Sequence, residues 1–323
     1  MNKVIVVGGG AAGMMAAISA ADSGAEVILI EKNEKLGKKV YITGKGRCNI
    51  TNESDVENLL KNVRSNPKFL YSAFYTFDSY RMMDFLEGEG LKLKTERGNR
   101  VFPESDKSSD VIKTLKKALE KRKVKIVLNT KVLNIEIKDG ICHGVIVQSG
   151  DKSGSYTADK VIVATGGCSY QSTGSTGDGY RFAKDADIKV TKCYPSLVPF
   201  NIGSDIPKRL QGLSLRNVKV TLSDKGKVLY EELGEMLFTH FGVSGPLVLS
   251  ASTLASGKDV SQMELSIDLK PALSKEQLDE RILRDFSENR NSYFKNSLSR
   301  LLPAKMIPVI VELSEIDEKK QVN

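Results

Sequence analysis

The chain has few of the residues that build metal sites and disulfide frameworks. Its 323 residues include two histidines, four cysteines and no tryptophan, and no two cysteines form a CxxC pattern. Cysteines this far apart are typical of reduced thiols, and two histidines give no metal-ligand spacing. We therefore expect no bound metal ion.

Long hydrophobic runs are missing as well. No apolar stretch approaches the length of a membrane span, and MNKVIVVGGG enters a strand at once, without the regions of a signal peptide. These absences predict a soluble cytoplasmic protein without a membrane partner. The sequence is silent on oligomeric state.

The charge is mildly basic. Lysine and arginine number 48 against 40 acidic residues, a net charge of +8. The densest basic run, KTLKKALEKRKVK at 113–125, favours a solvated helix face, and no aromatic interleaving supports a nucleic-acid partner. A basic surface would also attract anionic ligands such as nucleotides.

The most informative segment is at the start of the chain. Residues 3–7 are a β-branched run typical of a buried strand, a glycine-rich turn follows, and 11–24 is a small-residue helix that ends at Gly24. A second apolar strand, EVILI at 26–30, leads to Glu31. This is a βαβ unit with the spacing of a dinucleotide-binding site.

Each special residue in this unit has a mechanical reason. Gly8 permits the tight turn, Gly10 lets a diphosphate approach the backbone, and Gly13 lets the helix lie close to the strand. The helix start supplies free N–H groups for the phosphates. Glu31 can accept hydrogen bonds from a ribose hydroxyl and would repel the 2′-phosphate of NADP. The unit alone leaves FAD and NAD both open.

The middle of the chain begins with helices. Apolar residues at helical spacing predict helices over 56–90, and RVFPESD at 100–106 is typical of a turn near a pocket. A capped helix over 108–124 and a buried strand at 125–129 follow. We expect the aromatic residues of the first helices to be core residues: Phe69, Tyr71, Phe74, Tyr75 and Phe77.

Three further strands discriminate between the cofactors. KVLNIEIKDG, ICHGVIVQSGD and GSYTADKVIVAT, within 131–165, read as an antiparallel meander whose last strand ends in Thr165-Gly166-Gly167. This layout resembles the FAD-binding domain of the two-dinucleotide-binding flavoproteins, whereas an NAD dehydrogenase continues with regular βα units. The resemblance implies adenine contacts from the backbone near Val132.

A second glycine-rich stretch follows the meander. TGDG at 176–179 resembles the stretch of fumarate-reductase-type flavoproteins that leads into a helix. Asp178 is a candidate cap of that helix, with Gly177 and Gly179 keeping the backbone close to its neighbours. A plain capped turn without a cofactor role stays open.

The loop YITGKGRCNITN at 41–52 has almost nothing with which to build a core. It starts beside the adenosine end of the expected cofactor, and its glycines let main-chain N–H groups face an anion or a ring. Lys38, Lys39 and Arg47 could supply positive charge for phosphate, and Thr43 and Asn49 could orient the flavin ring. Cys48 reads either as a packed thiol beside the flavin or as a reactive one, with no partner cysteine close by.

These motifs also match a family. GxKxxITGxGRCNxTN, YPSLVPF at 194–200 and GEMLFTHFGVSGP at 234–246 resemble bacterial flavoproteins described as aminoacetone oxidase-like or BaiN-like NAD(P)/FAD-dependent oxidoreductases. The resemblance implies an α/β fold: a Rossmann-like FAD-binding domain with an inserted small β-barrel and a small helical domain. It also implies that Arg47, Cys48 and Asn49 fall near the FAD.

The second half supports that organisation. Short β segments and then amphipathic helices predict an FAD domain at 1–189, an antiparallel β domain at 190–271 and a helical domain at 272–323. His240, in a glycine-rich loop, is a candidate proton donor or a structural residue. The family continues with a glycine-rich return segment that this sequence lacks, so we expect a truncated member.

The sequence predicts an FAD-dependent oxidoreductase that passes electrons from NAD(P)H through the flavin to a small organic substrate. A flavin oxidase that uses O2 and a truncated fragment that is inactive or only binds a partner stay open. No catalytic acid or base is assigned. The predicted cofactor contacts are Gly8, Gly10, Ala11, Ala12, Gly13, Glu31, Lys32, Lys38, Thr43, Gly44, Arg47, Cys48, Asn49, Val132, Ala164, Thr165, Gly166 and Asp178.

Overall fold

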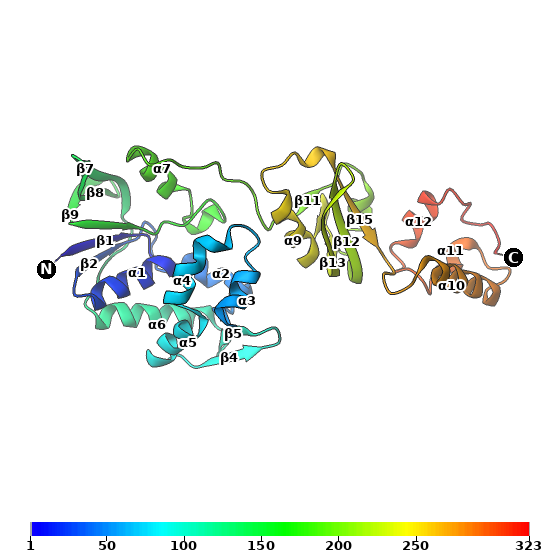
Figure 1. The fold of residues 1–323 in the computed structure, drawn as a ribbon, viewed down its shortest axis with the longest axis horizontal. Coiled ribbons are helices and arrows are strands. Elements are labelled where there is room, and N and C mark those ends of the chain that lie inside the picture. Colours follow the sequence, from blue (N-terminus) through cyan, green and yellow to red (C-terminus); the bar gives the residue numbers. More distant parts are fainter. Residues whose placement is uncertain (1, 323) are drawn as a thin grey trace. The chain divides into compact units, whose positions relative to one another are not determined.

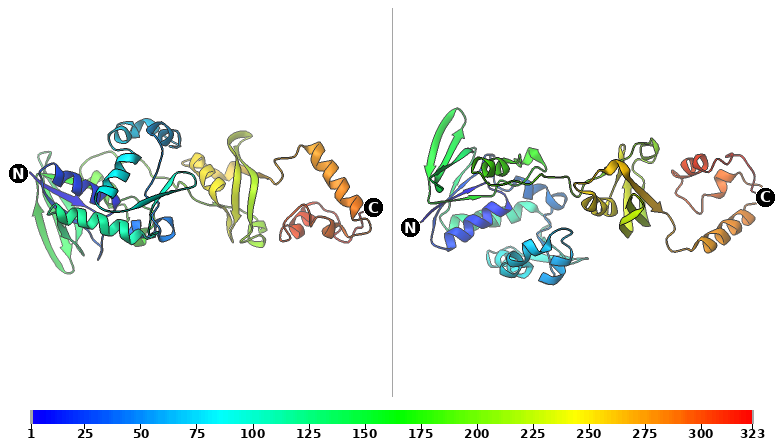
Figure 2. Two further views of the ribbon diagram at one scale, coloured as in Figure 1. Left: turned by 90° about the horizontal axis from the view of Figure 1, so that it is seen from below. Right: turned by 45° about the horizontal axis from the view of Figure 1, so that its top comes forward.

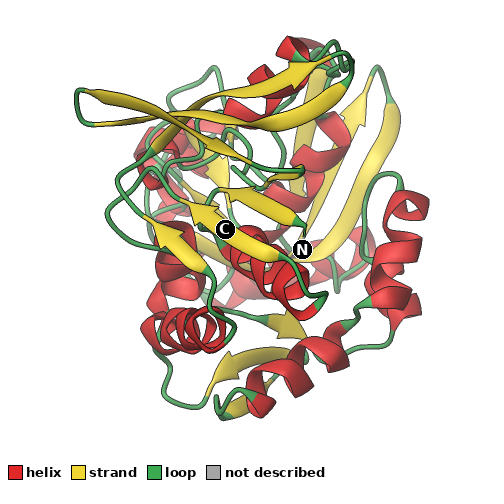
Figure 3. Ribbon diagram, turned by 90° about the vertical axis from the view of Figure 1, so that its left-hand side faces the viewer, coloured by secondary structure: helices red, strands yellow, loops and turns green. Residues whose placement is uncertain are grey.

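The structure is a computed structural model that describes residues 2–322. The chain forms two compact units, Met1–Thr191 and Lys192–Asn323, and each is described by itself. Helices and strands both occur along the chain (Figures 1 and 3), as the sequence predicts for an α/β protein. The predicted boundaries after residues 189 and 271 stay a prediction.

A four-stranded parallel sheet is the centre of the first unit. Its order is β10-β1-β2-β6, with β1 at Lys3–Val7, β2 at Glu26–Ile30, β6 at Lys125–Val127 and β10 at Lys160–Val163. β1 pairs in parallel with both neighbours, and Val4 faces Val27 and Lys160. The strands predicted at the start of the chain are confirmed.

The two faces of this sheet are covered differently (Figures 1 and 2). Helices α1 (Ala11–Asp22) and α6 (Ser108–Lys121) share a core with one face, to which Val6 belongs. Ile5 points to the other face and packs with Val145 of the meander. Successive residues of β1 therefore enter different cores, which explains why the strand is apolar from Val4 to Val7.

The predicted antiparallel meander is confirmed. Strands β7 (Lys131–Lys138), β8 (Ile141–Ser149) and β9 (Lys152–Thr157) form a sheet in the order β7-β8-β9. The chain then enters β10, which lies beside β1. The meander thus brings a distant segment back to the strand that carries the glycine-rich turn.

The basic run lies where it was predicted. Most of it lies on α6, whose Val111 and Leu115 are buried while Lys113, Lys116 and Lys117 are exposed. The lysines form the solvated side of an amphipathic helix.

The prediction that the aromatic residues of 69–77 are core residues is wrong. They lie on η2 (Pro67–Leu70), on α4 (Tyr71–Thr76) and just after it. These short segments contact chiefly each other and α3 (Val56–Lys61), so they offer too little surface to bury large rings. Phe74 is half-buried, and the exposed residues are Phe69, Tyr71, Tyr75 and Phe77.

The segment 100–106 was predicted as a turn, but its first half is a strand. β5 (Arg100–Pro103) is the central strand of a small antiparallel sheet between β3 (Thr51–Asn52) and β4 (Leu93–Glu96). Its partner β4 is joined to it by the short turn at 97–99, a hairpin that was not predicted from the sequence, whereas β3 has only two residues and is distant in the sequence. Helix α5 (Ser79–Gly88) lies between β3 and β4 in the sequence, and α2 (Lys38–Ile42) with η1 (Thr43–Gly46) comes before β3.

The second unit holds an antiparallel sheet in the order β11-β14-β13-β12-β15. Within residues 2–322 no pairing joins the outer strands β11 and β15, so the sheet is open rather than a closed barrel. Helix α9 (Pro246–Ala255), which the sequence did not predict, packs on its core. The strands are β11 (Phe200–Asn201), β12 (Ser214–Asp224), β13 (Lys227–Phe238), β14 (Gly242–Ser244) and β15 (Met263–Asp268), with α8 (Ile206–Arg209) and η4 (Val260–Gln262) between them.

The helices predicted near the end of the chain are present. α10 (Lys275–Glu288) starts with a capping box in which Ser274 and Gln277 satisfy each other's backbone amides. The second apolar stretch forms two short helices, α11 (Phe294–Ser297) and α12 (Ile307–Leu313). Over residues 2–322, no helix has the length and apolar character to cross a membrane.

Candidate functional site

A cavity of about 760 Å³ lies in the first unit, at the carboxyl ends of β1, β2 and β10. This volume is within the range of cofactor sites, and ligands of open α/β sheets bind at this edge. Fifteen of the predicted cofactor contacts line it: Gly8, Gly10, Ala11, Ala12, Glu31, Lys32, Lys38, Thr43, Cys48, Asn49, Val132, Ala164, Thr165, Gly166 and Asp178.

The glycine-rich turn forms a cradle that side chains would fill. Gly8 has φ +107°, and a Cβ there would lie 2.5 Å from the carbonyl oxygen of Ala164. A Cβ on Gly13 would lie 1.7 Å from the oxygen of Gly8, so helix and turn touch. Gly10 faces open space and caps α1 without a side-chain hydrogen bond. The first-turn amides therefore remain available to a diphosphate.

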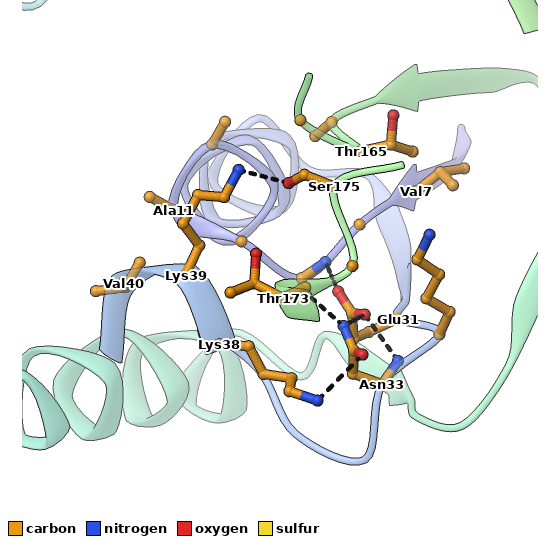
Figure 4. Close-up of a pocket in the computed structure, with 18 of the residues that line it drawn as sticks. Val7, Ala11, Glu31, Asn33, Lys38, Lys39, Val40, Thr165, Thr173 and Ser175 are labelled. Carbon is orange, nitrogen blue, oxygen red and sulfur yellow. Dashed lines mark hydrogen bonds between the residues drawn. The ribbon is translucent and has the colours of Figure 1, made fainter. Parts of the chain in front are cut away.

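Glu31 is buried at the end of β2 and is held by backbone and side-chain donors (Figure 4). Its Oε2 accepts from the N–H of Gly9 at 2.6 Å, and its Oε1 accepts from the backbone and side chain of Asn33 at 2.8 and 2.7 Å. A carboxylate offers about four acceptor positions. One position on Oε2 remains for a ribose hydroxyl.

Lysines give the cavity a positive balance. Lys32, Lys38, Lys39 and Lys131 line it, against the two carboxylates Glu31 and Asp178. This charge suits a diphosphate.

One of these lysines bridges two distant segments. The ammonium of Lys39 donates to Ser175 Oγ at 2.7 Å (Figure 4). It also donates to the carbonyl of Ser169 at 2.8 Å. It thereby ties α2 to the segment that follows β10. Because Lys39 also lines the cavity, its charge is available to a bound anion.

The prediction that Asp178 caps a helix is wrong. Asp178 is the first residue of α7 (Asp178–Asp185), Gly177 is the N-cap, and no side chain caps this helix. The Asp178 carboxylate instead pairs with Lys32 at 2.7 Å. Burial acts to raise the pKa of Asp178, but the hydrogen bond and charge of Lys32 outweigh it and lower the pKa. A Cβ at Gly179 would meet Thr165 Oγ1 at 2.9 Å, which confirms the close approach predicted there.

Cys48 lines the cavity as a buried thiol. Only 6% of its surface is exposed, and its backbone has φ +61°. Burial raises the pKa of the Cys48 thiol, against a smaller opposing effect of a hydrogen bond with Thr43. All four cysteines are free. The environment favours the packed thiol over the reactive one.

Three predicted contacts lie outside the cavity lining: Gly13, Gly44 and Arg47. Gly13 serves the cavity indirectly, through the packing of α1 on Gly8. Arg47 does not present its charge to the cavity, because its guanidinium pairs with Glu96 and Asp106.

Several residues of the site gave no sequence signal. Gly9 lies between the two motif glycines, yet its N–H holds Glu31 and a Cβ there would lie 2.4 Å from Leu36. Apolar side chains from α1, α5, α6 and α7 complete the walls, and only the tertiary packing selects them: Met15, Met82, Val111, Leu115 and Phe182.

The part of the chain that the structure describes contains no group of three or more His, Cys, Asp or Glu side chains that could hold a metal ion. His240 lies in the second unit, exposed, with its ring edge-on to Phe241 at 4.8 Å. Its role as a proton donor stays a prediction.

The parallel sheet, the meander and the glycine cradle define a flavoprotein with a Rossmann-like FAD-binding fold, and the residues of the cavity fit FAD. Comparison with known proteins agrees, since the family model described as "HI0933-like protein Rossmann domain" matches residues 2–266. The chain belongs to this family of FAD-dependent oxidoreductases.

Two relatives match over nearly the whole chain. The 3-dehydro-bile acid delta(4,6)-reductase of Clostridium scindens is 30% identical over 320 residues, which are 98% of this chain and 76% of the relative. The ribosomal RNA dihydrouridine synthase of Escherichia coli is 29% identical over 325 residues, 99% of this chain and 76% of the relative. Among solved structures, the open conformation of a flavocytochrome c3 fumarate reductase shares 24% identity and a TM-score of 0.47, over 67% of this chain and 47% of that one.

Proposed function

We propose that this oxidoreductase uses NAD(P)H to reduce a carbon–carbon double bond conjugated to a carbonyl in a small organic substrate. The observation that carries the proposal is the similarity, over nearly the whole chain, to two proteins named for reductions of this kind. A delta(4,6) bond of a 3-oxo bile acid and the C5–C6 bond of uridine are both conjugated to a carbonyl. FAD, when bound, supplies hydride transfer, which suits such a bond.

The chain's own residues bind and orient the cofactor. The turn around Gly8 and Gly10 and the start of α1 hold the diphosphate, and Glu31 accepts from the ribose. Thr43, Cys48 and Asn49 form the wall that the loop contributes. The buried apolar residues of the cavity limit access of water to the ring.

The presence of one dinucleotide motif suggests that NAD(P)H and the organic substrate bind to the site one after the other. This sequence has one GxGxxG, at Gly8–Gly13, and we propose that NAD(P)H docks transiently at the substrate side of the cavity. The nicotinamide and the substrate would then visit the same open side of the site one after the other. We expect ping-pong kinetics.

Anaerobic rapid mixing tests the proposal. The purified chain, loaded with FAD, is mixed with NADH or with NADPH, and loss of the visible flavin absorbance is followed. The reduced protein is then mixed with a 3-oxo-Δ4 steroid, with free uridine, with a uridine-containing RNA or with O2.

Fast recovery of the absorbance with the steroid or another small enone, together with slow recovery with O2, supports the proposal. Recovery only with O2 would show an oxidase. Recovery only with RNA would favour the second candidate, reduction of uridine in RNA, which the similarity to the dihydrouridine synthases supports. If neither NADH nor NADPH removes the visible flavin absorbance, the proposal that NAD(P)H is the electron donor is wrong.

A further inference from the structure

We infer that Arg47 is a positioning residue of the FAD cavity and not a phosphate ligand. Its guanidinium clamps the loop at residues 43–49 to the carboxylates of Glu96 and Asp106. The three residues Arg47, Glu96 and Asp106 are called the clamp below. The inference rests on the cavity and is independent of the substrate proposed above.

The loop that the clamp holds has a strained backbone. Gly44 and Gly46 have φ of 56° and 88°, and the non-glycine residues Lys45 and Cys48 have φ of 57° and 61°. L-residues rarely adopt this left-handed region. Such a conformation persists only where its surroundings over-determine it, so the loop needs contacts from outside itself.

The clamp provides those contacts through the planar fork of arginine. Arg47 Nε donates to Asp106 Oδ1 at 2.7 Å, Nη1 donates to Glu96 Oε2 at 3.3 Å, and Nη2 bridges both carboxylates. The guanidinium carbon also lies 4.2 Å from the centre of the Phe102 ring. Lysine cannot replace this arrangement, because an ammonium has neither the fork nor the flat face.

The charge of Arg47 is therefore already matched. Two carboxylates bind it, and Lys94 shares Asp106 at 2.5 Å. Arg47 also lies outside the cavity lining, whereas Lys38 and Lys39 line it. A phosphate would have to compete with two carboxylates for this guanidinium, so the lysines are the better partners.

Backbone contacts carry the effect of the clamp to the cavity wall. The N–H of Cys48 donates to the carbonyl of Thr43 at 3.1 Å, which closes the loop into a ring beside Arg47. A Cβ at Gly44 would lie 2.9 Å from the amide nitrogen of Asn49 and 3.4 Å from the Phe102 ring, so the loop packs tightly there. Thr43, Cys48 and Asn49 all line the cavity, and a loosened loop would displace all three.

Three measurements on the full chain test this inference: FAD binding, ADP binding and amide hydrogen exchange over 43–50. ADP reports on the adenosine and diphosphate end alone. The variants are Arg47→Gln, Arg47→Lys, Glu96→Gln and Asp106→Asn, with Arg100→Gln as the matched control. Arg100 also faces Phe102, at 5.8 Å, and lies 4.0 Å from Glu96, and its Nε donates to the carbonyl of Arg97, which is outside the loop.

We expect all four clamp variants to weaken FAD binding by about two- to fivefold, the effect of losing a partly exposed ion-pair network. ADP affinity should stay within about 1.5-fold, and exchange should accelerate at the amide of Cys48. Arg100→Gln should leave all three measurements unchanged. Arg47→Lys preserves the positive charge. If it weakens FAD binding as much as Arg47→Gln, the geometry of the guanidinium, and not its charge alone, holds the loop.

A phosphate-ligand role makes opposite predictions. Glu96→Gln and Asp106→Asn would free the guanidinium and tighten FAD binding, and Arg47→Gln would weaken ADP and FAD alike. Either result, or unchanged exchange over 43–50 in Arg47→Gln, would overturn the inference. If the chain holds no FAD at all, the proposed function fails, while the exchange measurement still decides the role of the clamp.

Discussion

The backbone N–H of Gly9 donates a hydrogen bond of 2.6 Å to Oε2 of Glu31 and so joins the turn after β1 to the end of β2. The carboxylate fixes the turn that faces the diphosphate and keeps one acceptor position for the ribose. One residue thereby shapes the turn and, in the proposed function, also binds the ribose.

Replacing Glu31 with Gln should weaken FAD binding by about tenfold, because an amide offers one acceptor oxygen in place of two and leaves a buried N–H unpaired, at a cost of about 1–3 kcal/mol. Fluorescence titration of the FAD-free protein measures the affinity. Glu26→Gln, at the exposed start of β2, is the control and should bind normally. Equal affinities for all three proteins would contradict the role given to Glu31.

Gly8→Ala should destabilise the first unit more than Gly24→Ala. Both glycines have positive φ, at 107° and 83°, so both substitutions carry a backbone cost of about 1 kcal/mol. Only Gly8 also meets an atom, the carbonyl oxygen of Ala164 at 2.5 Å, whereas Gly24 has open space. Chemical denaturation should show about 1–3 kcal/mol of extra loss for Gly8→Ala. Equal losses would show that the turn can relax.

Asp178→Asn should lower stability at neutral pH and have little effect in acid. The pKa of Asp178 is depressed, so its ionised form stabilises the fold above its ordinary pKa, and this contribution disappears as the pH falls through the lowered value. Thermal unfolding between about pH 7 and about pH 2 should show the two curves converging below about pH 4. In Lys32→Met, the effect of Asp178→Asn should shrink by about 0.5–1 kcal/mol. Curves that stay parallel down to the lowest pH would refute the pairing.

Cys48 should resist alkylation at neutral pH. Its thiol is buried with a raised pKa, and each unit of pKa lowers the thiolate fraction about tenfold. Mass spectrometry after iodoacetamide treatment should find Cys168 and Cys193, which are exposed, modified at least about tenfold faster. Cys48→Ser should retain turnover. Loss of turnover in a folded Cys48→Ser variant would support the hypothesis that Cys48 is a reactive thiol.

Local patterns were enough for the first βαβ unit. The β-branched run of β1, the spacing of Gly8, Gly10 and Gly13, and the acid that ends β2 each depend on neighbours within one βαβ unit. Short-range sterics and strand propensity decide such features. The same reasoning placed the meander, and fifteen of the eighteen predicted cofactor contacts line the cavity.

Features that depend on distant partners were missed or misread. Asp178 looks like a helix cap until Lys32, 146 positions away, is seen to pair with it. Phe69 and Tyr71 are residue types that are often buried, but the short helices around them are too small to bury their rings. Arg47 looks like a phosphate ligand until β4 and its neighbours bring Glu96 and Asp106 to it.

The sequence by itself determined the dinucleotide turn and the strands of the first βαβ unit, because these follow from steric rules within short segments. The choice of FAD over NAD came from the resemblance of the meander layout to flavoproteins. The tertiary structure alone decided which charges the cavity presents. Ion pairs form between side chains that folding brings together from distant positions, and pairing decides whether a charge such as that of Arg47 or Lys39 is available to a ligand.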